Sequence, residues 1–595
     1  MIPTLRRSPC PAAGRDAAAP LSRPSRLAAL GLAALGTAAL CATPLAAQDR
    51  NRFVPQDSCF VLRIAAPAKW RSHFAKTQVA KLMDANSLAP LMEQAAQAFD
   101  AGMQELRDSG LFDADLARGL VEDYRGDIVV SVQLDWDRFA EAMQTGATPP
   151  MSFVVALTPD GAFDLAAVAS EFERMVESQV DADAGDLRDL IAGDLTLRRS
   201  DNGGDEPDVT LPAVVDGHLV MLGGTRLEQD ATRLLADERR FEKGADDAPL
   251  FLHMDLAPLL SAVFEAADEG DAPFAVSEMM TRMGFGAIEG LTLRVDADAE
   301  HVTGEMSIGL KARERGVFEM FPATDRAPRL LASVPPGTES FSVSTMTFRP
   351  LFGLARDVWT SLGDAAPMSF DDAMDGFTEM TKVRLEQDLI AHLGDEVLVV
   401  QDVEAVRSFD FDDLESDPAA MLAGTVYGIA LRDGRAFDQS LETMLRARGL
   451  HVGRKREEYA GVQINSMRLL GLIEIECVVT DDLLLIAASG NEATRTALAG
   501  VLDTRAAGGV GVPDVVRQHT AAMAPGWNGI AVTPVAATFE GIVAALQASG
   551  EFGEEMDMVA QVVRAVGQDI RRLGIDSMVS ATYVDDRRLV SRFRW

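Results

Sequence analysis

An internal repeat constrains this chain more than any other feature of its sequence. Six sequence blocks occur twice, in the same order, at offsets that drift between about 264 and 287 residues. The clearest pair is VALTPDGAFD (155–164) and IALRDGRAFD (429–438). One weak match can arise by chance, but six collinear matches predict two copies of one domain. The predicted organisation is a signal peptide at 1–47, a first copy at 48–310, a linker at 311–326 and a second copy at 327–595.

Both copies predict the same succession of elements. Each opens with a strand, continues with long helical patterns, and then has two apolar strands, DIVVSVQL (127–134) and SFVVALT (152–158) in the first copy. A helix and further strands follow. Strands in adjacent pairs mixed with helices predict the α+β class: a tandem duplication of a mixed domain, with largely antiparallel sheets and helices packed on one face. Regular alternation of strand and helix is absent from the sequence, which disfavours a doubly wound or TIM-barrel fold.

Two joins between elements recur in both copies. Arg125-Gly126-Asp127, a tripeptide known from cell adhesion, has Leu393-Gly394-Asp395 as its counterpart, so only the glycine and the aspartate recur. This predicts a helix-to-strand join, with glycine as the left-handed residue that ends a helix, and not an exposed adhesion loop. The second join is a capping-box pattern that predicts a helix start, at Thr225 with Glu228 and at Ser489 with Glu492.

The N-terminal 47 residues have the three parts of a secretory signal peptide. Basic residues precede an apolar run, LAALGLAALGTAALCATPLAA (27–47), which ends at the small residues Ala46 and Ala47. We therefore expect an exported protein, periplasmic or secreted. Because the run approaches the roughly 20 residues that span a bilayer, a retained N-terminal anchor is the alternative. No later segment is long and apolar enough, so no membrane span is expected in the mature chain.

Charge and cysteine content limit the partners. The formal net charge is −36, and loss of residues 1–47, with five arginines and one aspartate, would bring it to about −40. Such a surface repels the phosphates of nucleic acids and anionic lipid headgroups, so nucleic acid is not expected as a partner. Only Cys59 and Cys477 remain after cleavage. One long-range disulfide and two buried free thiols are both open.

None of the residue clusters has the spacing of a known site. GFGAIEG (284–290) lacks the glycine register of a nucleotide loop, and LGGTRLE (222–228) already uses its helix start for a cap. The acidic runs 181–189, 201–208 and 410–417 lack the EF-hand positions that bind Ca²⁺. The seven histidines are not spaced for zinc, and no G-x-S-x-G elbow occurs. No catalytic, metal-binding or cofactor-binding residue is therefore predicted, and the protein is predicted not to be an enzyme.

The opening of the first copy resembles a known family. FVPQDSCFVLRIAAPAKWRSHFAKTQVAKLM (53–83) has a proline-led strand, a short polar link and a helix with Thr77, Val79 and Leu82. In this it resembles exported bacterial proteins of the domain-of-unknown-function family 3352. The resemblance implies a location in the envelope or outside the cell, and it supplies no catalytic residue.

Three functions are open. The first hypothesis is a non-catalytic exported protein with a binding or scaffolding role toward a protein or envelope partner. The second is a carrier of an apolar ligand such as a lipid, lined by the methionine-rich stretches VSEMMTRM (276–283) and MDMVAQVV (556–563). The third is a hydrolase with an unrecognised site. A continuous apolar cavity would favour the carrier. Convergent carboxylates or a histidine with a shifted pKa in a cleft would favour the enzyme, and a filled interior with an exposed apolar patch would favour partner binding.

Overall fold

The computed structural model describes seventeen stretches of the chain, some of which contain short gaps. It also describes a few single residues outside them. These stretches are residues 53–65, 74–83, 100–108, 112–142, 151–179, 187–200, 208–227, 248–268, 275–312, 316–403, 424–450, 455–469, 473–488, 492–521, 526–537, 565–573 and 577–595.

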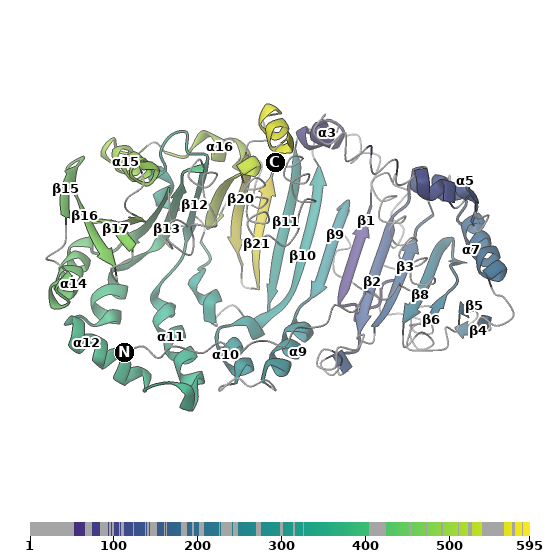
Figure 1. Ribbon diagram of the computed structural model, residues 1–595, viewed down its shortest axis with the longest axis horizontal. Helices are drawn as coiled ribbons and strands as arrows, with labels where there is room; N and C mark the ends of the chain where they lie inside the picture. Colours follow the sequence, from purple (N-terminus) through teal and green to yellow (C-terminus); the bar gives the residue numbers. More distant parts are fainter. Residues whose placement is uncertain are drawn as a thin grey trace, which may run out of the picture.

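The described strands form one antiparallel sheet with helices around it, which confirms the α+β class (Figure 1). Each strand pairs antiparallel with its neighbours. From one edge to the other the strands are β4 (Leu187–Ala192), β5 (Leu195–Ser200), β6 (Asp208–Thr210) beside β7 (Ala213–Val215), β8 (His218–Gly224), β3 (Met151–Leu157), β2 (Ile128–Leu134), β1 (Phe60–Ile64), β9 (Leu250–Asp255), β10 (Ile288–Ala297), β11 (Val302–Leu310), β21 (Arg588–Arg594), β20 (Ser577–Val584), β19 (Gly529–Pro534), β12 (Ser340–Thr345), β13 (Leu393–Gln401), β14 (Thr425–Leu431), β18 (Leu483–Ala488), β17 (Ile473–Val479), β16 (Val462–Leu469) and β15 (Lys455–Tyr459).

The strand order is the same in the two halves of the sheet, read outward from its middle. The first half runs β11, β10, β9, β1, β2, β3, β8, and the second runs β21, β20, β19, β12, β13, β14, β18. β11 pairs with β21, so the two halves meet in hydrogen-bonded register, with Glu305 opposite Arg592. Arg592 Nε donates a hydrogen bond of 2.7 Å to Glu305 Oε2. This order supports the predicted duplication, which stays a prediction.

The cross-strand register assigns each strand residue to one of two faces. Residues opposite one another in neighbouring strands point to the same side, and successive residues alternate. Val343 is opposite Leu398 and Ile530, and we call their side the core face. Ser344 is opposite Val397 and Gly529 on the other side, which we call the floor face.

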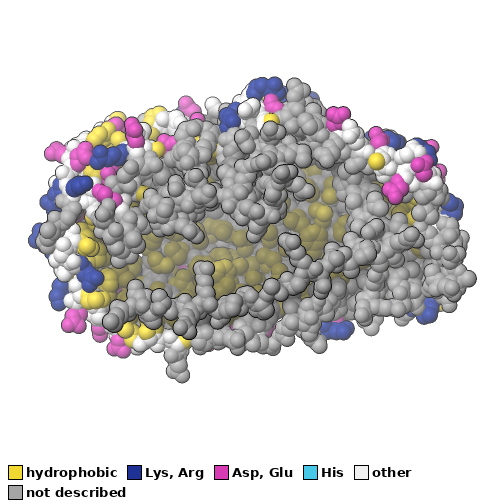
Figure 2. Space-filling model, in the orientation of Figure 1, with side chains coloured by type: hydrophobic (Ala, Val, Ile, Leu, Met, Phe, Trp, Pro, Cys, Tyr) yellow, Lys and Arg dark blue, Asp and Glu magenta, His cyan; other side chains and the backbone are white. Residues whose placement is uncertain are grey.

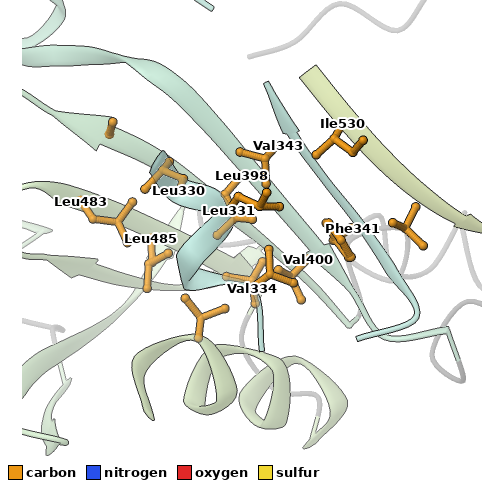
Figure 3. Packing of buried hydrophobic residues seen from close by; sticks show 14 of the residues in the cluster. Leu330, Leu331, Val334, Phe341, Val343, Leu398, Val400, Leu483, Leu485 and Ile530 are labelled. Atoms are coloured by element: carbon orange, nitrogen blue, oxygen red, sulfur yellow. The ribbon is translucent and has the colours of Figure 1, made fainter. Parts of the chain in front are cut away.

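The largest hydrophobic core lies on the core face of the second half. Leu398 and Leu485 are fully buried there beneath α15 (Glu492–Ala506) and the 3₁₀ helix Arg329–Ser333. Figure 3 shows Leu331 of that 3₁₀ helix beside Leu398 of β13. This core packs β12, β13, β14, β18 and β19 against α15 and the 3₁₀ helix.

Helices cover the floor face at the two ends of the sheet. α7 (Leu165–Gln179) and α5 (Ala114–Glu122) pack on β2, β3 and β8, and α14 (Gly434–Ala447) packs on β14, β17 and β18. In the described part of the chain the helices are therefore divided between both faces. Strands such as β13, with the run VLVV (397–400), have apolar side chains on both faces of the sheet. Both faces must therefore be covered by helices where these strands lie.

A row of helices follows one edge of the molecule, along the bottom of Figure 1. Neighbours in the row contact one another, and its last helix contacts α14. The row consists of α9 (Ala257–Asp268), α10 (Val276–Arg282), α11 (Arg349–Ser361) and α12 (Phe370–Thr381). On the opposite edge Figure 1 shows α3 (Gln78–Met83) and α16 (Asp514–Thr520).

Arg125-Gly126-Asp127 lies between α5 and β2, which confirms the predicted helix-to-strand join. The predicted reason for its glycine is wrong, because neither Gly126 nor Gly394 is among the residues with positive φ. Both glycines allow a close approach instead. A Cβ atom added to Gly126 would overlap the carbonyl oxygen of Thr158. A Cβ atom added to Gly394 would lie 2.9 Å from the carbonyl oxygen of Ala430. Each glycine thus lets the chain pass tightly against the adjoining strand.

Several sequence predictions fall outside the described residues. These are the signal peptide at 1–47, the N-cap residues Thr225 and Ser489, the acidic run 410–417 and the second methionine-rich stretch 556–563.

Cys59 and Cys477 are both buried, and neither forms a disulfide, so of the two open alternatives the structure has two buried thiols. Cys59 lies directly before β1, and its Sγ is 3.2 Å from the carbonyl oxygen of Val132. Burial raises the pKa of the Cys59 thiol from its ordinary 9.0 to about 11. The thiol is therefore neutral in the folded protein well above neutral pH.

We expect Cys59 to resist alkylation in the folded protein. At pH 8 its thiolate fraction should be about 100-fold below that of the unfolded chain, because the pKa is higher in the folded state. The neutral Cys59 thiol contributes fully to the free energy of unfolding below pH 9. This contribution is lost as pH rises from 9 to 11, because in that range the thiol ionises in the unfolded chain but stays neutral in the folded protein. Peptide mapping after iodoacetamide treatment, with and without urea, measures the reaction at Cys59. Equal labelling in both conditions would contradict the buried thiol.

Candidate functional site

The middle of the floor face is built from rows of residues that run across the strands. The register places Leu293 opposite Leu252 on one side and Met306 on the other. Met306 is opposite Ser591, which begins the second half of the row. The whole central row, strand by strand, is Leu62, Leu252, Leu293, Met306, Ser591, Thr582, Gly529, Ser344 and Val397.

In the eight central strands, β1, β9–β12 and β19–β21, none of the described residues that the register assigns to the floor face is charged. Glu289 lies at a bulge of β10, where the register assigns no face. The core face of the same strands is different. Arg294, Glu305 and Arg592 lie there, and Glu305 joins the two arginines at 3.7 Å and 2.7 Å. In β11 the charged Glu305 and the apolar Met306 are neighbours in sequence that point to opposite sides. The charged side chains to which the register assigns a face in β10, β11 and β21 therefore lie on the core face, opposite the floor face.

The central floor is partly open to solvent. Met306 is 42% exposed, and the other side chains of the central row are half-buried apart from the buried Gly529. Figure 2 shows a hollow in front of the central strands whose floor is mainly hydrophobic. Uncharged, partly exposed side chains gathered in a concave surface are the usual lining of a site for an apolar ligand.

The first methionine-rich stretch forms α10, in the row of helices along the bottom of Figure 1. None of the α10 residues is buried, and Met279, Met280 and Met283 are half-buried. Their flexible side chains can therefore adapt their positions without disturbing a packed core.

The glycine-rich stretch 284–290 has a structural role. Gly284 has a positive φ of 97° and precedes a 3₁₀ turn, Phe285–Ala287, that leads into β10. In LGGTRLE, Gly224 ends β8 at φ 136°, close against the backbone of Ser152. Gly284 and Gly224 are thus required by backbone geometry, a turn in one case and a close approach of two chain segments in the other.

Four of the five described histidines make structural contacts, at three separate places. His253 Nδ1 lies 3.0 Å from Thr292 Oγ1, and His218 Nδ1 lies 3.2 Å from the carbonyl oxygen of Asp216. His519 lies near His301 and Arg594, and burial is the main cause that lowers its pKa. Across the residues placed by the structure, no group of three or more His, Cys, Asp and Glu side chains could hold a metal ion.

The floor was not found from the sequence, although a signal for it exists. β10 reads IEGLTLRVDA, in which Leu291, Leu293 and Val295 alternate with polar residues. Such alternation marks a strand with one apolar side, but it does not tell whether a helix covers that side. Only the positions of the neighbouring elements decide that.

The described helices include none long and apolar enough to cross a membrane. No protein-family model matches the chain, and no curated protein matches it. The resemblance of residues 53–83 to the domain-of-unknown-function family 3352 therefore stays a prediction.

Among solved structures, two crystal forms of TP0453 are similar to parts of this chain. Crystal form III covers 44% of this chain and 80% of its own, at 9% identity and a TM-score of 0.20. Crystal form IV covers 44% and 81%, at 7% identity and a TM-score of 0.20. A TM-score of this size supports no conclusion about fold or function.

Proposed function

We propose that this chain is an exported, non-catalytic protein that binds an apolar ligand, such as the acyl chain of a lipid, in the hollow of the floor face. The observation that carries the proposal is the floor itself, whose described side chains on eight adjacent strands are uncharged and in part exposed. Export rests on the predicted signal peptide alone.

The energetics favour an apolar occupant. Exposed apolar surface is costly in water, and covering it yields about 25 cal/mol per Å². Each methylene group of an acyl chain that leaves water contributes about 0.8 kcal/mol. A flexible chain can follow a concave floor, and no charged group on the described floor would have to lose its hydration.

A scaffolding role needs a different surface. Partner proteins usually dock through a projecting or flat patch with a polar rim and a few buried anchors. Here the apolar side chains line a hollow (Figure 2), which suits a small occupant better than a folded domain.

Native mass spectrometry of the purified protein tests the proposal. We expect a discrete added mass of lipid size that organic extraction removes. We also expect the extracted protein to bind a pyrene-labelled fatty acid methyl ester in a saturable way. A clean ligand-free mass together with no saturable binding of the ester would sink the proposal.

A further inference from the structure

We infer that the second half of the floor is a headgroup site for an uncharged lipid that carries hydroxyl groups, with the acyl chain over the first half. The inference rests on the proposed function and deepens it. The ligand class is a neutral glycerolipid, such as a monoacylglycerol.

Seven hydroxyl-bearing side chains lie on the floor face of β12, β19, β20 and β21, and five of them gather around Gly529 and Ala531. Ser344 and Thr582 lie on either side of Gly529: a Cβ on that glycine would be 3.4 Å from the Cβ atoms of both. Ser591 is opposite Thr582 on the next strand. We call the set the hydroxyl patch; it consists of Ser342, Ser344, Ser580, Thr582 and Ser591.

Small residues leave room above the hydroxyl patch. Gly529 and Ala531 occupy the strand between Ser342 and Ser344 on one side and Ser580 and Thr582 on the other. These two positions carry no side chain larger than a methyl group, so a headgroup can approach the sheet closely there.

The corresponding part of the first half is apolar. β1 holds the place of β12 in the strand order and has Leu62 and Ile64 on its floor face. β10 holds the place of β20 and has Leu293 and Val295 there. The two halves therefore share an arrangement of strands but differ in floor chemistry, as an amphiphile with a tail and a polar head requires.

An aromatic ring marks the boundary between the two chemistries. The ring of Phe593 lies over Gly304, where any Cβ would collide with it. Gly304 belongs to β11 and Phe593 to β21, the two strands at which the halves meet. The apolar floor thus ends with a ring that packs on backbone, and the hydroxyl patch begins on the same strand as that ring, at Ser591.

Hydroxyl groups select for uncharged polar partners. Each can both donate and accept a hydrogen bond, and no such bond is seen for Ser342, Ser344 or Thr582 among the described residues. A glycerol hydroxyl or an ester carbonyl would satisfy them. A phosphate is disfavoured, because the described floor has no cation and the chain carries a net charge of −36.

Three probes with the same chain and different heads test the inference. They are 1-oleoylglycerol, which has hydroxyls, methyl oleate, which has none, and oleoyl lysophosphatidic acid, which is anionic. Competition with the pyrene-labelled ester measures each affinity. We expect 1-oleoylglycerol to bind at least about tenfold more tightly than either of the others, because its hydroxyl groups can form a few hydrogen bonds with the hydroxyl patch without an added charge.

A variant without the hydroxyl patch provides the second arm. It combines Ser342→Ala, Ser344→Ala, Ser580→Ala, Thr582→Val and Ser591→Ala, which nearly conserve side-chain volume. We expect it to lose the preference for 1-oleoylglycerol and to keep its affinity for methyl oleate. Ser307→Ala, on the core face of β11, is the matched control and should keep the preference.

The outcomes separate the two proposals. Equal binding of all three probes, a preference for the phosphate, or an unchanged preference in the variant overturns the headgroup site alone. Failure of all three probes to bind the wild-type protein overturns the proposed function and the headgroup site together.

Discussion

Met306→Asp is expected to weaken binding of the pyrene-labelled ester by about 100-fold or more, with little change in the midpoint of urea unfolding. Met306 lies in the central row of the floor and is 42% exposed, so the fold tolerates a polar side chain there. A bound acyl chain would cover the new carboxylate, and an unpaired charge taken out of water costs several kcal/mol. A loss of 2.7 kcal/mol corresponds to about 100-fold in Kd.

Ile191→Asp is the matched control for this experiment. Ile191 is an apolar strand residue that is 72% exposed on β4, at the far edge of the sheet. Its replacement adds the same charge and removes a similar side chain, yet it should leave ester binding unchanged. Equal affinities of wild type and Met306→Asp would place the ligand elsewhere and refute a site on the central floor.

Gly126→Ala is expected to lower the free energy of unfolding by about 3 kcal/mol or more. The added methyl group would overlap both the carbonyl oxygen of Thr158 and the hydroxyl of Tyr124. That hydroxyl lies 2.7 Å from the Thr158 oxygen and 2.9 Å from the Asp127 oxygen, and Tyr124 is fully buried. Room for the methyl group therefore requires breaking buried hydrogen bonds or moving β3 away from β2.

Urea unfolding followed by circular dichroism measures this effect. Gly353→Ala is the control, because Gly353 lies within α11 and an added Cβ would meet no atom within 4 Å. Alanine there should stabilise the protein by about 0.5–1 kcal/mol, through its higher helix propensity. If Gly126→Ala is as stable as the wild type, the close approach at the start of β2 is not what requires glycine.

The Arg-Gly-Asp tripeptide shows how far sequence reasoning reaches. Its counterpart at Leu393-Gly394-Asp395 was enough to predict a join between elements, and α5 and β2 confirm it. The reason for the glycine was wrong, because it depends on Thr158 and Ala430, which are 32 and 36 residues further along the chain. Local pattern predicts where an element ends, and distant neighbours decide why a residue is required there.

The floor shows the same division. Alternation along β10 gives it one apolar side, and that information is local. The sequence also contains the hydroxyl-bearing residues of β12, β20 and β21. However, more than 200 residues separate Ser344 of β12 from Thr582 of β20. Nothing in the linear order brings them together, so the candidate site could not be predicted.

By itself, the sequence determined the α+β class and the alternation of each strand, since both depend on neighbouring residues. Only the tertiary structure decided that β11 pairs with β21 and that β19 lies between β12 and β20. Those pairings join an apolar half-floor to a hydroxyl-bearing one. The physical reason is that contacts between strands link residues far apart in the chain, and their choice depends on how all the strands pack at once.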